Sequence, residues 1–214
     1  MNERAPDSKS KLLAAAAEEF ARHGPRGARV AEIVRRAGVN ERMIYHHFGS
    51  KDGLYRAVIQ DQGAGLLERW LPYLDRALEA DSPREGLRRA YLGYFLAFHA
   101  RPLFGVLVLR EATQDWAVRP PLTSTVLPEQ LRELFRRAER AGVLNADLVV
   151  CHAIAISALT VAPSVRGPLG GNRPEIGERI VDVLLDGMIG KGGEHDGHGG
   201  ADHRSGADRA DAGG

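Results

Sequence analysis

The stretch from Val30 to Leu54 constrains the fold more than any other part of this 214-residue chain. Apolar residues recur at helical spacing up to Ala37, and the run stops at Gly38, a residue that tolerates the left-handed conformation in which many helices end. Asn40 is a good N-cap for a second helix, because its side-chain oxygen can accept a free backbone N–H. Two short helices joined by a tight Gly-containing turn form a helix-turn-helix, and a third helix is expected to start directly after it.

The second helix of this motif keeps its polar and aromatic side chains away from the core. Ile44 and Phe48 lie four residues apart and share the face that is expected to be buried. The side chains expected to face outward are Arg42, Met43, Tyr45, His46 and His47. An aromatic residue, a basic residue and two imidazoles suit a nucleic-acid groove better than a hydrophobic core.

The same stretch resembles the N-terminal DNA-binding region of the TetR/AcrR family of bacterial transcription regulators. The matching run from Ile33 to Leu54 is I-V-x-x-A-G-V-N-x-x-x-I-Y-x-H-F-x-S-K-D-x-L, and the resemblance extends over about residues 8–58. One departure is Ala28, where the family usually has a Thr or Ser that caps the first helix of the motif. The loss of that cap is expected to cost about 1 kcal/mol of local stability.

The resemblance assigns two kinds of DNA contact to this region. The positions that match base-reading residues of the family are Glu41, Arg42, Met43 and His46. The positions that match phosphate-binding residues are Tyr45, His47 and Lys51. An arginine can pair with guanine in the major groove, and a lysine at a helix N-terminus favours an anion. The alternative is an exposed helix whose polar side chains are merely solvated.

Charge and cysteine content are compatible with this interpretation. Residues 1–56 carry eleven Lys and Arg against seven Asp and Glu, whereas residues 191–214 carry three against five, so the positive excess lies at the motif. The single cysteine, Cys151, excludes an intrachain disulfide framework and suits a reducing compartment. No signal peptide and no apolar run of membrane-spanning length are visible, so a cytoplasmic protein with no membrane partner is expected.

The rest of the chain predicts an all-α fold without an alternating strand pattern. The expected helices run from Ser8 or Ser10 to about His23, from Ser50 to a break near Pro72, from Ser82 to Arg101, from Phe104 to Trp116, over roughly 123–141 with Pro128 as a kink or a start, and from Asn145 as cap to Val161. A last helix is expected to place five apolar residues on one stripe: Ile176, Ile180, Val183, Leu184 and Met188.

Three parts follow from this division. Residues 1–56 form a three-helix head with the helix-turn-helix, residues 57–190 form a C-terminal helical bundle for ligand binding and dimerisation, and residues 191–214 form a disordered tail. Helix-turn-helix dimers read two half-sites, so a homodimer is expected. The resemblance places its interface on the last two helices; the alternative is an ordinary buried helix pair.

The resemblance also implies a pocket for a small-molecule effector of unknown identity in the body. The candidate ligand-binding residues are Tyr94, Phe98, Phe104, Arg110, Gln114 and Trp116. The alternative is that the aromatic residues are core and that Arg110 forms an ion pair.

The sequence offers no support for an enzyme, a cofactor or a metal site. Cys151 and His152 are adjacent on a helix, so their side chains diverge by about 100°. The tail residues His195, His198 and His203 are not preorganised as metal ligands.

The chain is therefore interpreted as a ligand-responsive regulator that binds double-stranded DNA, a repressor by the habit of the family. A dimer would bind a palindromic operator and be released by a small molecule, with the helix from Leu54 to about Trp70 as the lever. The alternative function is a helical small-ligand-binding protein with nonspecific DNA binding.

Overall fold

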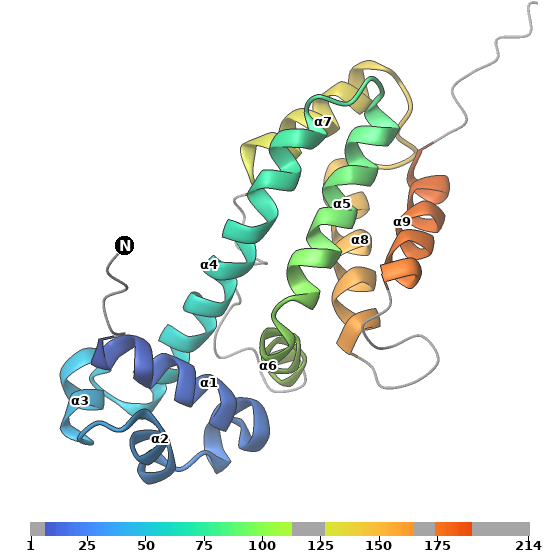
Figure 1. Cartoon of the computed structure of the whole chain (residues 1–214). Helices are drawn as coiled ribbons and strands as arrows, with labels where there is room; N and C mark the ends of the chain where they lie inside the picture. Colours follow the sequence, from blue (N-terminus) through green and yellow to red (C-terminus); the bar gives the residue numbers. More distant parts are fainter. Residues whose placement is uncertain (1–6, 113–126, 165–173, 190–214) are drawn as a thin grey trace, which may run out of the picture.

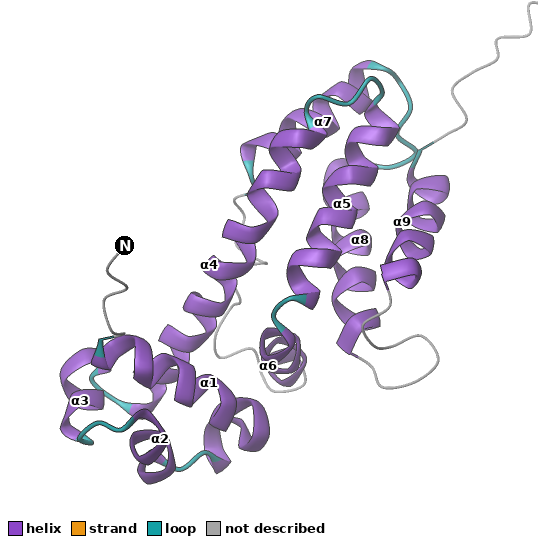
Figure 2. Ribbon diagram, in the orientation of Figure 1, coloured by secondary structure: helices purple, strands orange, loops and turns teal. Residues whose placement is uncertain are grey.

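The computed structural model describes residues 7–112, 127–164 and 174–189, and within these ranges the regular elements are helices and one isolated bridge between Leu144 and Ile189 (Figure 1, Figure 2). The helices are α1 (Ser8–Gly27), α2 (Val30–Ala37), α3 (Arg42–Phe48), α4 (Lys51–Ala77), α5 (Pro83–His99), α6 (Pro102–Ala112), α7 (Glu129–Arg140), α8 (Leu148–Ser164) and α9 (Pro174–Met188). The all-α prediction is confirmed.

Helix α1 begins and ends at local signals. Asp7 caps it, since its carboxylate accepts the backbone N–H of Ser10 at 2.8 Å. The prediction of Ser8 or Ser10 as the cap was wrong, because Ser10 is the donor in this bond and an ionised carboxylate is the stronger acceptor. The predicted break at Gly24 is confirmed by its φ of 69°, and one further turn runs to Gly27.

The head has its own apolar core. This core joins α1, α2 and α3 to the first part of α4 through Ile59, and Leu107 of α6 also belongs to it. Phe20 packs edge-on against Tyr55 at a centroid distance of 4.9 Å. The domain boundary predicted after residue 56 stays a prediction; the apolar contacts of the head extend slightly beyond it.

Helix α4 connects the head to the body along the molecule (Figure 1). The predicted break near Pro72 was wrong, because the helix continues to Ala77. A proline inside a helix costs about 3 kcal/mol. Burial of Trp70 and Leu74 in the body core can offset that cost, at about 1.5–3 kcal/mol for a large apolar side chain. The Trp70 indole also donates to the Ala90 carbonyl at 2.7 Å.

The body core is aromatic and lies around α5. It gathers side chains from α4, α5, α6, α7, α8 and α9, and its largest members are Tyr91, Tyr94, Phe95, Phe98, Phe104 and Phe135. Two ion pairs join α5 to α9 at its edge: Arg84 contacts Asp186, and Arg88 lies 2.8 Å from Asp182.

The structure decides between the two alternatives for one helix start and corrects the predicted cap of another. Pro128 is the N-cap of α7, so it starts the helix. Asn145 does not cap α8: its side-chain amide donates to Gly187 O and its backbone N–H to Met188 O, so it closes the end of α9. Asp147 caps α8 instead by accepting the Val150 N–H at 3.0 Å.

Parts of three predictions lie outside the described ranges. These are the extension of α6 from Ala112 to Trp116, the first residues, 123–126, of the helix expected over roughly 123–141, and the disordered tail at 191–214. Across the parts of the chain that are described, no single helix is long and apolar enough to cross a membrane; only the bent pair Pro83–His99 and Pro102–Arg110 reaches that length and composition together.

Candidate nucleic-acid interface

The turn of the helix-turn-helix has the predicted geometry. Gly38 adopts φ 64° and ψ 36°, the left-handed conformation, and its N–H bonds to Val34 O. The side-chain oxygen of Asn40 accepts the Arg42 N–H at 2.9 Å. These two residues end α2 and start α3, so the angle between the helices is set by local chemistry.

Helix α3 buries one side chain completely and exposes most of its polar residues. Ile44 is fully buried in the head core, as predicted. The exposed candidates are Glu41, Arg42, Tyr45 and His46. Met43 packs half-buried against the head core, so its predicted outward orientation was only partly right. It lies beside Ile44 in sequence, and its long flexible side chain can cover the edge of the apolar cluster.

His47 is also less exposed than predicted, because it joins α3 to the start of α1. Its Nε2 lies 2.9 Å from Ser8 Oγ. Its ring packs edge-on against those of His46 and Phe48, at centroid distances of 4.9 and 5.9 Å. No sequence signal pointed to Ser8, since the two partners are 39 residues apart.

The segment after α3 brings a lysine to a helix N-terminus. Ser50 caps α4 by accepting the Gly53 N–H at 3.0 Å, and Lys51 begins the helix. The Lys51 ammonium donates to Arg26 O at 3.3 Å, which ties this corner to the end of α1. Gly53 is required here, because a Cβ at this position would lie 2.0 Å from Phe48 O.

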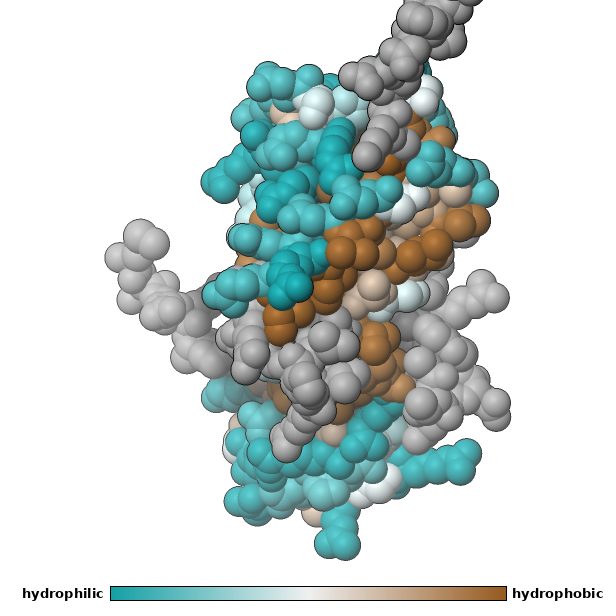
Figure 3. All heavy atoms as spheres, turned by 90° about the vertical axis from the view of Figure 1, so that its right-hand side faces the viewer, coloured by the Kyte–Doolittle hydropathy of each residue, from teal (hydrophilic) through white to brown (hydrophobic). Residues whose placement is uncertain are grey.

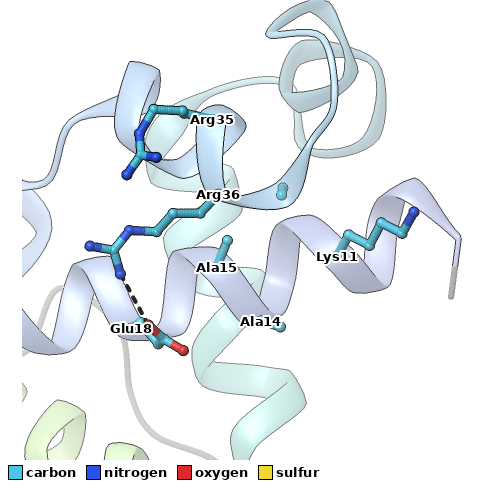
Figure 4. A pocket seen from close by; sticks show the side chains of 7 residues that line it. Lys11, Ala14, Ala15, Glu18, Arg35 and Arg36 are labelled. Carbon is cyan, nitrogen blue, oxygen red and sulfur yellow. Dashed lines mark hydrogen bonds and ion pairs between the residues drawn. The ribbon is translucent and has the colours of Figure 1, made fainter.

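The arginines of the head fall into two classes. Those at the open groove between α1 and α2, of about 640 Å³, are ion-paired. Arg36 lies 3.0 Å from Glu18 (Figure 4). Arg36 also lies 2.7 Å from Glu32, and Arg35 lies 2.6 Å from Glu32. The hydrogen bonds from Arg35 and then Arg36 lower the pKa of Glu32 to about 2. The Arg42 guanidinium, by contrast, has no hydrogen bond or ion pair with any residue that the structure describes. It is available to an external acceptor.

Three of the candidate ligand residues come together in the body. Tyr94, Phe98 and Phe104 are buried and form a row with successive centroid distances of 5.9 Å. The Tyr94 hydroxyl bonds to Thr160 Oγ1 at 2.7 Å, and burial raises the pKa of Tyr94. Gln114 and Trp116 lie outside the described residues.

Arg110 lies apart from that row, at the junction of body and head. Its guanidinium donates to Ala21 O at 3.1 Å and to Arg22 O at 3.0 Å, in the last turn of α1 before Gly24. Helix α6 therefore spans the two cores: Leu107 belongs to the head core, and Phe104 and Val108 belong to the body core. Sequence reasoning missed this role because nothing local marks a partner 89 residues away.

Comparison with known proteins agrees with this geometry. Residues 12–58 match the family described as bacterial regulatory proteins, tetR family. The HTH-type transcriptional repressor Rv3405c of Mycobacterium tuberculosis is 29% identical over 145 residues, which cover 68% of this chain and 67% of that protein. The HTH-type transcriptional activator FasR of Mycolicibacterium smegmatis is 29% identical over 174 residues, which cover 78% of this chain and 75% of that protein.

A solved structure extends the similarity to the body. The TetR family transcriptional regulator PfmR of Thermus thermophilus superposes with a TM-score of 0.61 and 25% identity, covering 81% of this chain and 96% of that one. The matched motif in residues 12–58, the relatives and the shared architecture support a DNA-binding transcriptional regulator that is similar to the tetR family of bacterial regulatory proteins.

Proposed function

We propose that this chain is a ligand-responsive transcriptional repressor that binds a palindromic operator as a homodimer and is released by a small molecule. The observation that carries the proposal is the combination of an exposed DNA-reading helix with a large apolar face on the body. The face suits a second copy of the chain, and the helix suits one half of an operator.

The apolar face, here called the α8–α9 face, consists of side chains that are between 44 and 72% exposed: Val149, Val150, Ile154, Val161 and Val183. The opposite side of α9 is buried in the body through Val181 and Leu185. Within the apolar stripe predicted for the last helix, Val183 is exposed and Met188 is buried. Apolar residues gather on the side of the body shown in Figure 3. Contiguous exposed apolar patches mark interaction sites.

A twofold axis through the α8–α9 face would present two copies of α3 on one side of the dimer. Such pairs read half-sites about 34 Å or a multiple of that distance apart. Within each half-site we assign base contacts to Glu41, Arg42, Met43 and His46, and phosphate contacts to Tyr45, His47 and Lys51. The exposed guanidinium of Arg42 supports its place as the principal base-reading residue.

The effector is assigned to the aromatic part of the body. Its chemistry would be largely apolar with one or two polar groups, since the aromatic row there is accompanied by the buried hydroxyl pair of Tyr94 and Thr160. A ligand that displaced Phe104 would also displace α6, and with it the contacts of Leu107 and Arg110 to the head. We therefore propose that α6, together with α4, carries the effect of ligand binding from the body to the head.

Catalysis is not part of the proposal. Cys151 is buried, and burial raises the pKa of its thiol. The adjacent His152 faces the Tyr91 hydroxyl at 3.2 Å instead of the thiol. The relatives are named as transcriptional regulators, one a repressor and one an activator, so the repressor assignment is an inference from the family.

The proposal is tested by selecting bound fragments from random-sequence duplex DNA at near-physiological salt. The protein should enrich a palindrome, and the Arg42→Ala, Tyr45→Ala double variant should lose the enrichment. Arg35→Ala is the matched control, because Arg35 is exposed on α2 and paired with Glu32. Steeply salt-dependent binding without an enriched motif would contradict the proposal and favour a ligand-binding protein with nonspecific DNA affinity.

A further inference from the structure

The first residues of α2 lack a cap of their own. Arg29 is the N-cap residue, and its side chain makes no capping hydrogen bond. Ala28, where the resemblance places the cap, lies one residue too early: it ends α1, with its N–H bonded to Gly24 O at 3.0 Å. The expected loss of a cap is therefore real, but its position is Arg29.

The acidic residue that could complete a local capping box is engaged elsewhere. In a capping box, the residue at the third helical position accepts the backbone N–H of the N-cap residue. Glu32 occupies that position in α2, but its carboxylate accepts hydrogen bonds from Arg35 and Arg36 at 2.6 and 2.7 Å. The Arg29 N–H must find its acceptor outside α2.

That acceptor is Glu19 of α1. One carboxylate oxygen of Glu19 accepts the Arg29 N–H at 3.2 Å, and the residue is only 2% exposed. The bond joins two helices across ten residues of chain and takes the place of the missing half of the capping box. The carboxylate also lies at the positive end of the α2 dipole, which favours a negative charge.

The rest of the environment of Glu19 satisfies its carboxylate only in part. Its second oxygen has no hydrogen-bond partner among the residues described, and the imidazole Nε2 of His23 lies 3.9 Å away. Arg36 is a cationic neighbour of Glu19. The pKa of the Arg36 guanidinium is raised mainly by its hydrogen bond to Glu32 and, to a smaller extent, by the negative charge of Glu19. A buried carboxylate with one unpaired oxygen is less favourable for packing than an apolar side chain of similar size.

We propose that Glu19 is a positioning residue for DNA recognition: its carboxylate fixes the start of α2 on α1 and thereby the orientation of α3, without touching DNA. The proposal rests on the proposed function for its DNA readout. The same part of α1 receives Arg110 from the body at Ala21 O and Arg22 O. Glu19 therefore lies on α1 next to the residues that bind Arg110 of the body, and it also contacts the start of α2 in the helix-turn-helix.

The first experiment measures amide hydrogen exchange and does not involve DNA. In Glu19→Leu the Arg29 amide should exchange at least about tenfold faster than in the unmodified protein, because its acceptor is gone. In Glu19→Gln the exchange should stay within about threefold, because the amide oxygen can still accept. Unchanged exchange in Glu19→Leu would overturn the capping role whatever the protein binds.

The second experiment measures affinity for the duplex that the unmodified protein enriches from the random pool. Glu19→Leu should weaken binding about tenfold, while its thermal midpoint stays equal or rises because an incompletely paired buried charge has been removed. Glu19→Gln should bind with an affinity within about threefold of that of the unmodified protein, because its amide oxygen can still accept the hydrogen bond. This variant serves as the test if Glu19→Leu does not fold. Equal affinity of Glu19→Leu and the unmodified protein would overturn the positioning role.

A double-mutant cycle with Arg29→Ser separates positioning from a general effect on the head. The substituted side chain would give α2 a cap of its own and free the helix start from Glu19. In the Arg29→Ser background, Glu19→Leu should therefore weaken binding by less than about threefold, and additive losses would contradict the proposal. If the unmodified protein enriches no duplex, the proposed function fails, and the exchange experiment still decides whether Glu19 holds α2.

Discussion

The head and the body of this regulator are built by different rules. The residues to which we assign DNA contacts lie in one continuous stretch, and the turn and cap bonds at the two ends of α3 join residues at most four positions apart. The tyrosine hydroxyl contacts in the interior of the body join residues far apart in sequence: Tyr91 and His152 are separated by 61 positions, and Tyr94 and Thr160 by 66. A local motif specifies the head, whereas the body depends on the packing of the whole chain.

The two cores differ in side-chain size as well. The head core uses a series of alanines from α1 and α2, which let these helices approach closely, whereas the body core uses large aromatic rings. Small side chains fix a compact unit with one arrangement. Large rings leave more ways to repack around a ligand, which suits the part of the molecule that we assign to the effector.

The largest expected effect is on the α8–α9 face. Val150→Glu with Ile154→Glu should convert the protein to a monomer and weaken operator binding at least about a hundredfold, because two linked half-site contacts become one. Light scattering gives the mass, and fluorescence anisotropy gives the affinity. Leu67→Glu, at a similarly exposed leucine of α4, is the control and should change neither. A Val150→Glu, Ile154→Glu protein that remains dimeric would move the interface to another face.

The next largest effect is on stability, and it is expected to differ between a glycine of the head and a glycine of the body. Gly53→Ala should destabilise the head by roughly 1–3 kcal/mol, because its Cβ would lie 2.0 Å from the Phe48 carbonyl oxygen, a backbone atom that cannot move aside alone. Gly187→Ala in α9 meets nothing within 4 Å and should be neutral or stabilising by up to about 1 kcal/mol. Urea unfolding monitored by circular dichroism measures both. Equal stability of the two variants would show that α3 and α4 are not held as tightly as their geometry indicates.

The same division explains how much the sequence could predict. Gly38, Asn40, Ser50 and the helices around them were predicted correctly, because each signal lies within a few residues of its effect. Pro72 was misread as a break, because the compensating burial of α4 against the body is not visible in the local sequence. Local rules were also insufficient at Asn145, whose amide closes another helix.

The residues that connect the parts were the hardest to find. Arg110 was predicted to bind ligand, and its contacts to the last turn of α1 depend on how α6 crosses the head. Nothing in the sequence marked Glu19, since a glutamate in an amphipathic helix is ordinarily solvated. Val183 and Met188 were predicted to share one apolar stripe, but Val183 is exposed and Met188 is buried, because periodicity alone cannot divide such a stripe between an inner and an outer face.

A smaller effect is expected on the pH dependence of the body. Burial lowers the pKa of His152 to about 4, below its ordinary value of 6.5, so the folded state keeps this imidazole neutral where the unfolded chain would protonate it. Stability is therefore complete above about pH 6.5 and should fall by about 2 kcal/mol as the pH decreases to about 4. His152→Gln should lose this part of the pH dependence while keeping a polar partner for Tyr91. His46→Gln, on the exposed side of α3, should retain it, and identical profiles for all three proteins would contradict the assignment.

The smallest effect tests whether the two regions are mechanically separate. Arg110→Met removes two hydrogen bonds from α6 to α1 and should destabilise the head by about 1 kcal/mol, with faster amide exchange in the last turn of α1. Arg137→Met is the matched control, because its guanidinium also donates to a backbone carbonyl, that of Leu78, but entirely within the body. It should destabilise the body and leave exchange in α1 unchanged. If Arg110→Met also leaves α1 unchanged, α6 holds the head through Leu107 alone, and a ligand signal would have to pass through apolar packing and α4.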